Sequence, residues 1–267
     1  MPRRLLILFI CLCALALLAP RPALAQAGPP YITNDPGTPG NANWEINIAE
    51  MTTVQRGVDS YQVPQIDLNF GLGDRIQLTF EVPYVAQTAD GQPGASAWGN
   101  ALPGVKWRFV DQGEDGWQIS TFPQLEMRAS AYAQRAGIAG DGPRLLLPVE
   151  FAHPVGPLDL DFEAGYYFPW HGNGNEERVV GFVAGHTFSP RLELDAELYN
   201  DHGMGGKPPD FTSLDLGGRY RLHRGFILLF MAGRSIAGPA ATRIDFMAYL
   251  GIQVLLSNYG RTLTTEP

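Results

Sequence analysis

RLELDAEL, at residues 191–198, alternates leucine or alanine with charged side chains along its whole length. Successive side chains of an extended chain point to opposite faces, so this pattern predicts a β-strand with one apolar and one charged face. The same period of two recurs in QIDLNF at 65–70, RIQLTFEV at 75–82, LDLDFEA at 158–164 and RIDF at 243–246. The repeated pattern predicts an all-β protein.

Turn residues divide the chain into about twelve such strands. Alternation alone fits a soluble sandwich as well as a barrel, so the connections between the strands have to decide. The predicted strands are residues 44–55, 60–71, 74–87, 98–110, 116–129, 143–154, 157–170, 177–188, 190–201, 212–222, 225–235 and 242–256.

The connections alternate between two kinds along the chain. The short ones are 71–74, 155–157, 189–190 and 223–224, with the somewhat longer 111–116. The others are mostly long and rich in Gly, Pro, Asp and Asn, at 88–97, 130–142, 171–176, 201–211 and 236–241. Short periplasmic turns opposite longer external loops are typical of outer-membrane barrels, so the sequence predicts a transmembrane antiparallel β-barrel with up-and-down topology. The first hairpin, near 56–59, is an exception because its loop is short.

Aromatic residues gather near both predicted ends of the strands. Two such girdles, one at each membrane interface, are expected of a barrel that faces lipid. The girdle at the short turns comprises Trp44, Trp107, Phe109, Trp117 and Tyr220, and that at the long loops comprises Tyr84, Tyr166, Phe168 and Trp170.

The first 25 residues are typical of a secretory signal peptide. Arg3 and Arg4 precede an apolar run at 5–18, and the small-residue site Ala-Leu-Ala at 23–25 predicts cleavage before Gln26. The run is shorter than the roughly 20 residues that a membrane-spanning helix needs. We therefore predict a signal peptide at 1–25, a Pro/Gly-rich segment at 26–43, the barrel at 44–256 and a tail at 257–267.

Composition excludes several classes of function. Both cysteines, Cys11 and Cys13, lie in the predicted signal, so the mature chain has no disulfide, thiol nucleophile or thiolate metal site. The formal net charge is −8, and loss of the three arginines of the signal makes it about −11. Nucleic acid is therefore not expected as a partner. No later stretch is apolar and long enough for a membrane-spanning helix, so any segments that cross a membrane must be β-strands.

The ionisable residues of the strands are predicted to line the barrel interior, because a charged side chain costs about 2–4 kcal/mol on the lipid face at mid-membrane. Acids outnumber bases among them. The lumen is thus either an aqueous passage that mildly favours cations or a narrow interior closed by its own ion pairs. The candidates are Asp67, Arg75, Glu81, Arg108, Glu126, Arg128, Asp159, Asp161, Glu163, Glu193, Asp195, Glu197, Asp215, Arg219 and Asp245.

Two prolines and one apolar run interrupt the pattern. Pro123 and Pro148 lie in predicted strands, where the missing N–H predicts bulges or shifted boundaries. The run FILLFM at 226–231 is apolar on both faces, so its orientation is not assigned. The last strand is predicted to end near Leu256.

The start of the mature chain resembles a known family. PYITNDPGTP at 30–39 and WEIN at 44–47 look like the opening of the outer-membrane transporter-like family named for the meta-pathway of phenol degradation. GLGDR at 71–75, VPY at 82–84 and GVKWRF at 104–109 are similar to its next strand and turn signatures. The resemblance covers about the first third of the mature chain, and Asn34 stands where an acidic residue is expected. It implies a barrel linked to aromatic catabolism or carrying small apolar molecules inward, and it transfers no site residues.

Residues 26–43 are too rich in Pro and Gly for regular structure, and two interpretations are open. A tether lying in the periplasm is the favoured interpretation. The alternative is a plug inside the lumen, where Thr33, Asn34 and Asp35 could meet the interior arginines.

The predicted function is an outer-membrane channel or transporter for small molecules, hydrophobic or aromatic ones among them. The alternatives are a structural or surface-interaction barrel with a plugged lumen and, third, a lipid hydrolase that uses a Ser-His pair. The five histidines lie outside any serine-hydrolase motif, so we predict no enzyme, and the loop residues His171, His202 and Asp201 lack metal-ligand spacing. No cofactor is predicted. The expected partners are outer-membrane lipid, a small solute, the barrel assembly machinery and periplasmic chaperones.

Overall fold

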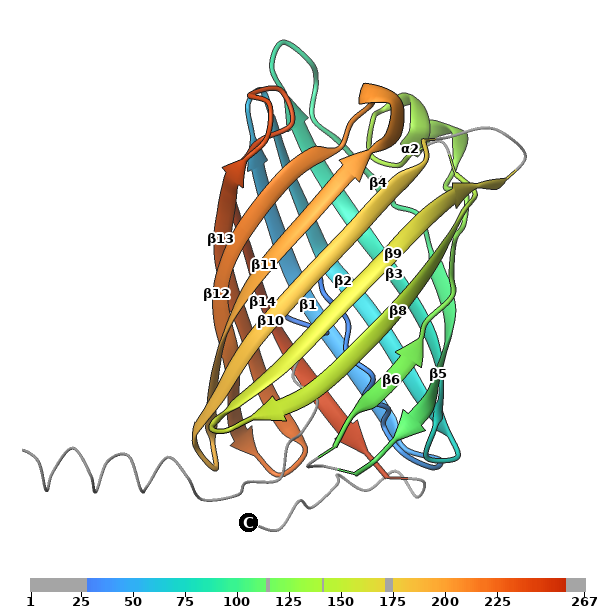
Figure 1. Ribbon diagram of the computed structural model, residues 1–267. Helices are drawn as coiled ribbons and strands as arrows, with labels where there is room; N and C mark the ends of the chain where they lie inside the picture. Colours follow the sequence, from blue (N-terminus) through green and yellow to red (C-terminus); the bar gives the residue numbers. More distant parts are fainter. Residues whose placement is uncertain (1–27, 114–115, 141, 171–174, 258–267) are drawn as a thin grey trace, which may run out of the picture.

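The computed structural model describes residues 28–113, 116–140, 142–170 and 175–257 (Figure 1). The predicted signal peptide at 1–25, His171 and all of the predicted tail except its first residue lie outside the described residues. The strands form one antiparallel sheet that closes on itself, because the first strand pairs with the last from Trp44↔Leu256 to Gln55↔Ile244.

The sheet has fourteen strand segments. They are β1 (Trp44–Gln55), β2 (Val58–Leu72), β3 (Ile76–Ala89), β4 (Ala95–Trp98), β5 (Leu102–Asp111), β6 (Gln118–Thr121), β7 (Gln124–Glu126), β8 (Arg144–Val155), β9 (Leu158–Pro169), β10 (Glu177–Ser189), β11 (Leu192–Gly203), β12 (Asp210–His223), β13 (Phe226–Ala237) and β14 (Ile244–Leu256). Two short helical turns, α2 (Ala131–Arg135) and η2 (Met204–Gly206), lie in the loops after β7 and β11.

These segments make twelve strand positions around the barrel, because two positions are built from two segments each. β3 pairs with β4 at one end and with β5 at the other, and β8 pairs with β7 and β6 in the same way. Each other strand pairs with its neighbours in sequence. The predicted twelve-strand, antiparallel, up-and-down barrel is therefore confirmed.

The two interior prolines meet at one break in the wall. β8 pairs with β6 at Thr121↔Val149 and with β7 at Gln124↔Leu146, so Pro148 faces the gap that contains Pro123. Neither proline has an N–H to donate across this gap, and Thr121 Oγ1 donates a 2.7 Å hydrogen bond to the Pro148 carbonyl instead. The predicted irregularity at Pro123 is confirmed, whereas Pro148 lies within the continuous strand β8.

Each strand has an apolar outer face and a more polar inner face. Leu216 on β12 is 61% exposed on the outside, whereas its neighbour Asp215 is fully buried inside. The structure also assigns the apolar run on β13, because Leu229 and Met231 are buried in the interior core and Phe226 is exposed. An apolar exterior of this kind is the surface that a bilayer requires.

Exposed aromatic rings mark both rims of the barrel. At the rim of short turns, the Trp44 and Phe70 ring centroids lie 4.8 Å apart, and Trp107 lies near Phe109. At the rim of long loops, the Tyr84 ring lies 5.3 Å from that of Trp98. This arrangement fits two membrane interfaces. Within the described residues, no helix combines the length and the apolar character needed to cross a bilayer.

The N-terminal segment, residues 28–43, lies inside the barrel (Figure 1). Tyr31 and Thr33 are buried there, so the favoured interpretation of this segment as a periplasmic tether is wrong. Burial is physically feasible because prolines such as Pro29, Pro30 and Pro36 have no backbone N–H that would need a partner. We call residues 28–43 the plug.

Candidate functional site

Two interior carboxylates hold the tip of the plug. Thr33 N donates a 2.6 Å hydrogen bond to Glu197 Oε1, and Ile32 N donates to Glu197 Oε2 at 3.3 Å. Asn34 N donates to Glu163 Oε2 at 2.7 Å. Backbone N–H groups bonded to carboxylates are charge-assisted and stronger than neutral pairs. The plug is thus fixed to β9 and β11 through its backbone.

The same part of the plug, residues 31–34, also contacts this region of the wall through Tyr31 and a wall glycine. The Tyr31 hydroxyl donates a 3.1 Å hydrogen bond to the Asp195 carbonyl, and burial raises the pKa of this phenol, which keeps it a donor. Thr33 packs against Gly181 on β10, where a Cβ would lie only 2.8 Å from the Thr33 Cβ. Gly181 therefore leaves the space that the plug fills.

Lys106 on β5 holds the middle of the plug. Its Nζ lies 4.0 Å from Asp35 Oδ1, donates to the Asp35 carbonyl and lies 3.8 Å from Glu150 Oε2 on β8. Arg219 Nη2 donates to the Pro29 carbonyl at 3.1 Å. Of the three predicted plug contacts, Thr33 and Asn34 thus meet carboxylates and Asp35 meets a lysine. For Thr33 and Asn34 the predicted partners, interior arginines, are corrected to carboxylates, while the ion pair that the structure shows for Asp35 is with Lys106.

The last part of the plug is joined to the rim of short turns. Ala42 N donates to the Gly71 carbonyl at 2.8 Å, and Gly71 N donates to the Asn43 carbonyl at 3.0 Å. Thr38 Oγ1 donates to the Asp74 carbonyl at 2.9 Å. A side chain at Gly71 would collide with the carbonyl of Gly40. The C-terminal end of the plug is therefore bonded to β2 and leads directly into β1.

A cavity of about 1570 Å³ remains beside the plug. Its lining reaches from Ile138 and Gly140, beyond β7 in the long loop, to Ser189 and Arg191 at the short turn after β10. Plug residues and wall residues both border it. The plug narrows the interior but leaves space along it.

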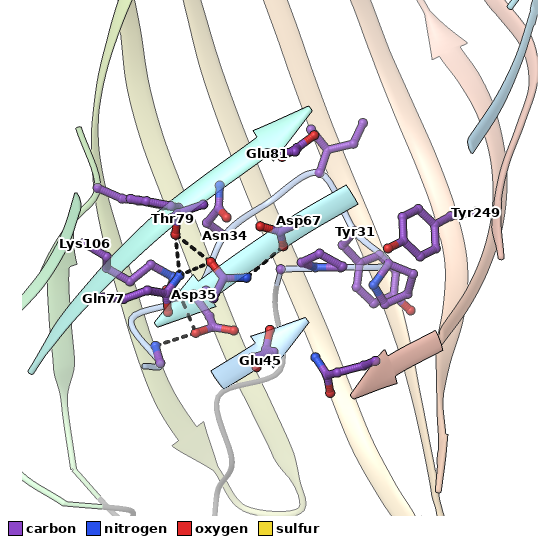
Figure 2. Close-up of a pocket in the computed structure, with 18 of the residues that line it drawn as sticks. Tyr31, Asn34, Asp35, Glu45, Asp67, Gln77, Thr79, Glu81, Lys106 and Tyr249 are labelled. Carbon is purple, nitrogen blue, oxygen red and sulfur yellow. Dashed lines mark hydrogen bonds and ion pairs between the residues drawn. The ribbon is translucent and has the colours of Figure 1, made fainter. Parts of the chain in front are cut away.

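The cavity has one polar and one apolar wall. Amides and carboxylates of β1, β2 and β3 form a hydrogen-bonded network, in which Asn47 and Asn69 both donate to Asp67 Oδ2 at 2.9 Å. In the same network, Gln77 Nε2 donates to Thr79 Oγ1 at 3.0 Å (Figure 2). Gln65 donates to Glu81 Oε1 at 2.6 Å. The apolar wall comprises Met51, Leu146, Tyr167, Val179, Tyr199, Ile227 and Tyr249.

Most predicted lumen residues lie on the inner face. The buried ones are Asp67, Glu126, Asp161, Glu163, Asp195, Glu197 and Asp215. The partly buried ones on the same faces are Glu81, Arg108, Asp159, Glu193 and Arg219.

Three predicted lumen residues do not lie in the enclosed interior. Arg75 is exposed in the turn between β2 and β3, and Arg128 is exposed after the end of β7. Asp245 is exposed because the register of β14 shifts between Phe246 and Ile244, which interrupts the alternation. These three positions are corrected to rim residues.

Sequence reasoning missed several interior charges. Arg144 pairs with Glu126 at 2.5 Å and with Glu177, and its guanidinium lies 4.5 Å from the Tyr167 ring centroid. Arg144 begins the stretch RLLLPV, in which polar and apolar residues do not alternate. The sequence therefore does not indicate which face of the strand Arg144 occupies. Lys106 could have been found, since it is two residues from Arg108 and so on the same face.

Three of the four described histidines have partners that suit structural roles. His153 stacks on Trp117, and His186 Nδ1 lies 2.6 Å from the Pro157 carbonyl. His202 pairs with Asp210 at 3.0 Å. In the described part of the chain, no group of three or more His, Cys, Asp or Glu side chains could hold a metal ion.

A closed antiparallel barrel with an apolar belt, aromatic rims and a polar interior defines a transmembrane β-barrel of the outer-membrane type. Within this class, the chain resembles the COG4313 outer membrane channel from Pseudomonas putida F1, with a TM-score of 0.60 and 12% identity over 89% of this chain and 100% of that one.

Two porins of known structure are also similar. The NanC porin has a TM-score of 0.57 and 7% identity, over 78% of this chain and 98% of that one. The KdgM porin in complex with disordered oligogalacturonate has a TM-score of 0.52 and 10% identity over the same shares. No protein-family model matches the chain, and no curated protein matches its sequence. At these identities the likeness establishes a shared fold.

Proposed function

We propose that this protein is an outer-membrane channel for small solutes, in which the plug at 28–43 sets the size of the passage. The observation that carries the proposal is the cavity of about 1570 Å³ beside the plug, whose lining includes residues at both rims. Side chains alone fill the interior of a barrel of about eight strands, and a barrel of twelve strands is wide enough to keep open space along its axis.

The charge of the lumen supports a preference for cations. Carboxylates such as Glu163, Glu193 and Asp67 border the cavity, and Lys106 and Arg219 are the basic side chains that touch the plug. A pore lined by an excess of acids attracts cations and repels anions. Arg108 and Arg221 also border the cavity, so the preference is expected to be weak.

The apolar wall supports organic solutes over bare ions as the physiological cargo. Tyr167, Tyr199 and Tyr249 border the cavity next to aliphatic side chains, and such surfaces bind the apolar parts of small molecules. The sequence resemblance to the phenol meta-pathway family implies cargo of the same kind, and both the family and the aromatic cargo stay predictions. Interaction with outer-membrane lipid, the assembly machinery and chaperones belongs to the same proposal.

Planar-bilayer recording tests the proposal. The refolded mature chain, residues 26–267, should give stable steps with a weak cation preference. A variant lacking residues 28–39 keeps the bonds of Ala42 and Asn43 to Gly71 and should give larger steps. Unchanged conductance on deletion would contradict the role of the plug, and a folded barrel without current in either form would contradict the channel.

A closed structural barrel is the second candidate, and the dense bonding of the plug favours it. Backbone donors at Ile32, Thr33 and Asn34 are all bound to interior carboxylates. If these bonds never open and the remaining space conducts nothing, the barrel acts through its surface. The recording on the intact chain decides between the two candidates.

A further inference from the structure

We infer that Glu45, Asp67 and Glu81, on the inner wall formed by β1, β2 and β3, bind the charged group of a small organic ammonium ion. Tyr31 of the plug and Tyr249 of β14 border the same space and would receive its apolar part (Figure 2). The inference rests on the proposed channel, because a solute must reach the lumen. It names the class of solute that this wall would hold.

Register places two of these acids directly opposite each other. Asp67 on β2 pairs with Glu81 on β3, and Asn47 on β1 pairs with Asp67. Directly opposed residues on one face have Cβ atoms only about 4.5–5.5 Å apart, and like charges at that separation destabilise a sheet. Glu45 lies two residues before Asn47, on the same face, and borders the same cavity. A cation between these groups would remove the repulsion.

Asp67 has an oxygen atom that lacks a partner. Its side chain accepts two amide hydrogen bonds at Oδ2. The other oxygen, Oδ1, is buried without a hydrogen-bond partner in a residue that is only 7% exposed. Within the described part of the chain, neither Asp67 nor Glu81 forms an ion pair with a basic side chain. A buried carboxylate oxygen is costly unless it is paired, and Asp67 is one of the residues that line the cavity. It therefore points to a ligand that carries positive charge.

The spacing of the acids favours an ammonium ion over a metal ion. Among the described residues, no three acidic or histidine side chains come close enough to coordinate one metal. A metal such as Ca²⁺ needs six to eight oxygen ligands at about 2.3–2.6 Å, which this wall does not supply. An ammonium group is larger and needs only neighbouring acceptors. The aromatic faces of Tyr31 and Tyr249 add the attraction that such cations have for π systems.

Calorimetric titration tests this inference on the refolded mature chain, residues 26–267, in detergent. The probe is benzylammonium, and its neutral counterpart is benzyl alcohol. We expect benzylammonium to bind and benzyl alcohol to bind at least about tenfold more weakly. The double variant Asp67→Asn, Glu81→Gln should lose at least about tenfold in affinity for benzylammonium. These amides keep the size of both side chains and remove the like charges, so the barrel should fold, as heat-modifiability on a gel will show.

Glu50→Gln is the matched control. Glu50 lies on β1, five residues from Glu45, and is exposed on the outer face opposite Leu250. Its substitution should leave the affinity for benzylammonium unchanged. If the double variant does not fold, the single variant Glu45→Gln must show the loss. Equal binding by wild type and acid variants, equal binding of benzyl alcohol, or binding of Ca²⁺ alone would each overturn the inference.

Bilayer recording separates this inference from the proposed function. A channel that conducts while benzylammonium neither binds nor blocks would overturn the ammonium site and leave the channel standing. Binding that depends on Asp67 and Glu81 in a barrel that never conducts would support the site and overturn the channel. Block of the current that the double variant abolishes would support both.

Discussion

Thr33 and Glu197 are joined by a 2.6 Å hydrogen bond across 164 positions of sequence, and both residues are fully buried. The donor is a backbone N–H of the plug, and the acceptor is a carboxylate in the middle of β11. One interaction thus connects the first described part of the chain to the far wall of the barrel. Together with the bonds of Glu163 and Lys106 to the plug, it sets the position of the plug and with it the width of the passage.

Glu197→Ala should release the tip of the plug. Ile32 and Thr33 would lose their acceptors, and hydrogen bonds to a charged group contribute about 1.5–3 kcal/mol each. A loss of that size corresponds to at least about tenfold more of the released state. The measurement is maleimide labelling of Asn34→Cys, the only thiol of the mature chain. Labelling at the wild-type rate in Glu197→Ala would show that this carboxylate does not hold the plug.

Gly181→Val should displace the plug by occupying its space. A Cβ at this position would lie 2.8 Å from the Thr33 Cβ, which is closer than real Cβ atoms come to other heavy atoms, so the two residues cannot keep their present positions. We expect larger conductance steps than in the wild type. Ala184→Val is the control, because Ala184 lies on the outer face of the same strand and faces lipid. Equal conductance in both variants would contradict the close contact between Gly181 and Thr33.

Arg144→Met should destabilise the barrel. The substitution would leave Glu126 and Glu177 as two neighbouring interior carboxylates without their common partner. Loss of one partner from a buried pair costs roughly 3–5 kcal/mol. The temperature at which the folded band disappears in heat-modifiability gels should therefore fall. Adding Glu126→Gln and Glu177→Gln should restore much of the loss. A triple variant as unstable as Arg144→Met would assign the effect to lost packing on Tyr167.

Leu216→Arg should lower the stability of the barrel because residue 216 lies deep in the membrane. Leu216 lies near the middle of β12 and is 61% exposed on the outer face. Arginine on the lipid face costs about 2–4 kcal/mol at the midplane and about 0–1 kcal/mol near the interface. Leu222→Arg, close to the short-turn end of the same strand, should therefore be much milder. Unfolding titrations in lipid vesicles measure both, and equal costs would contradict the placement of the belt.

Strand number and order could be predicted because the signals are local. Alternation at 191–198 and tight turns such as 189–190 report the conformation of neighbouring residues only, and a barrel of sequential hairpins requires no more. The three misplaced charges, Arg75, Arg128 and Asp245, lie where a turn, a strand end or a register shift ends the alternation. Arg144 was missed because its strand is apolar on both faces for several residues.

The amino-acid sequence by itself determined the barrel, since side-chain periodicity and turn chemistry fix each strand and its two faces without reference to distant residues. Only the tertiary structure decided what fills the barrel. A proline-rich segment has the same local character as a tether or as a plug. Its burial depends on Glu163, Glu197 and Lys106, which lie far from it in sequence and meet it only after the barrel closes.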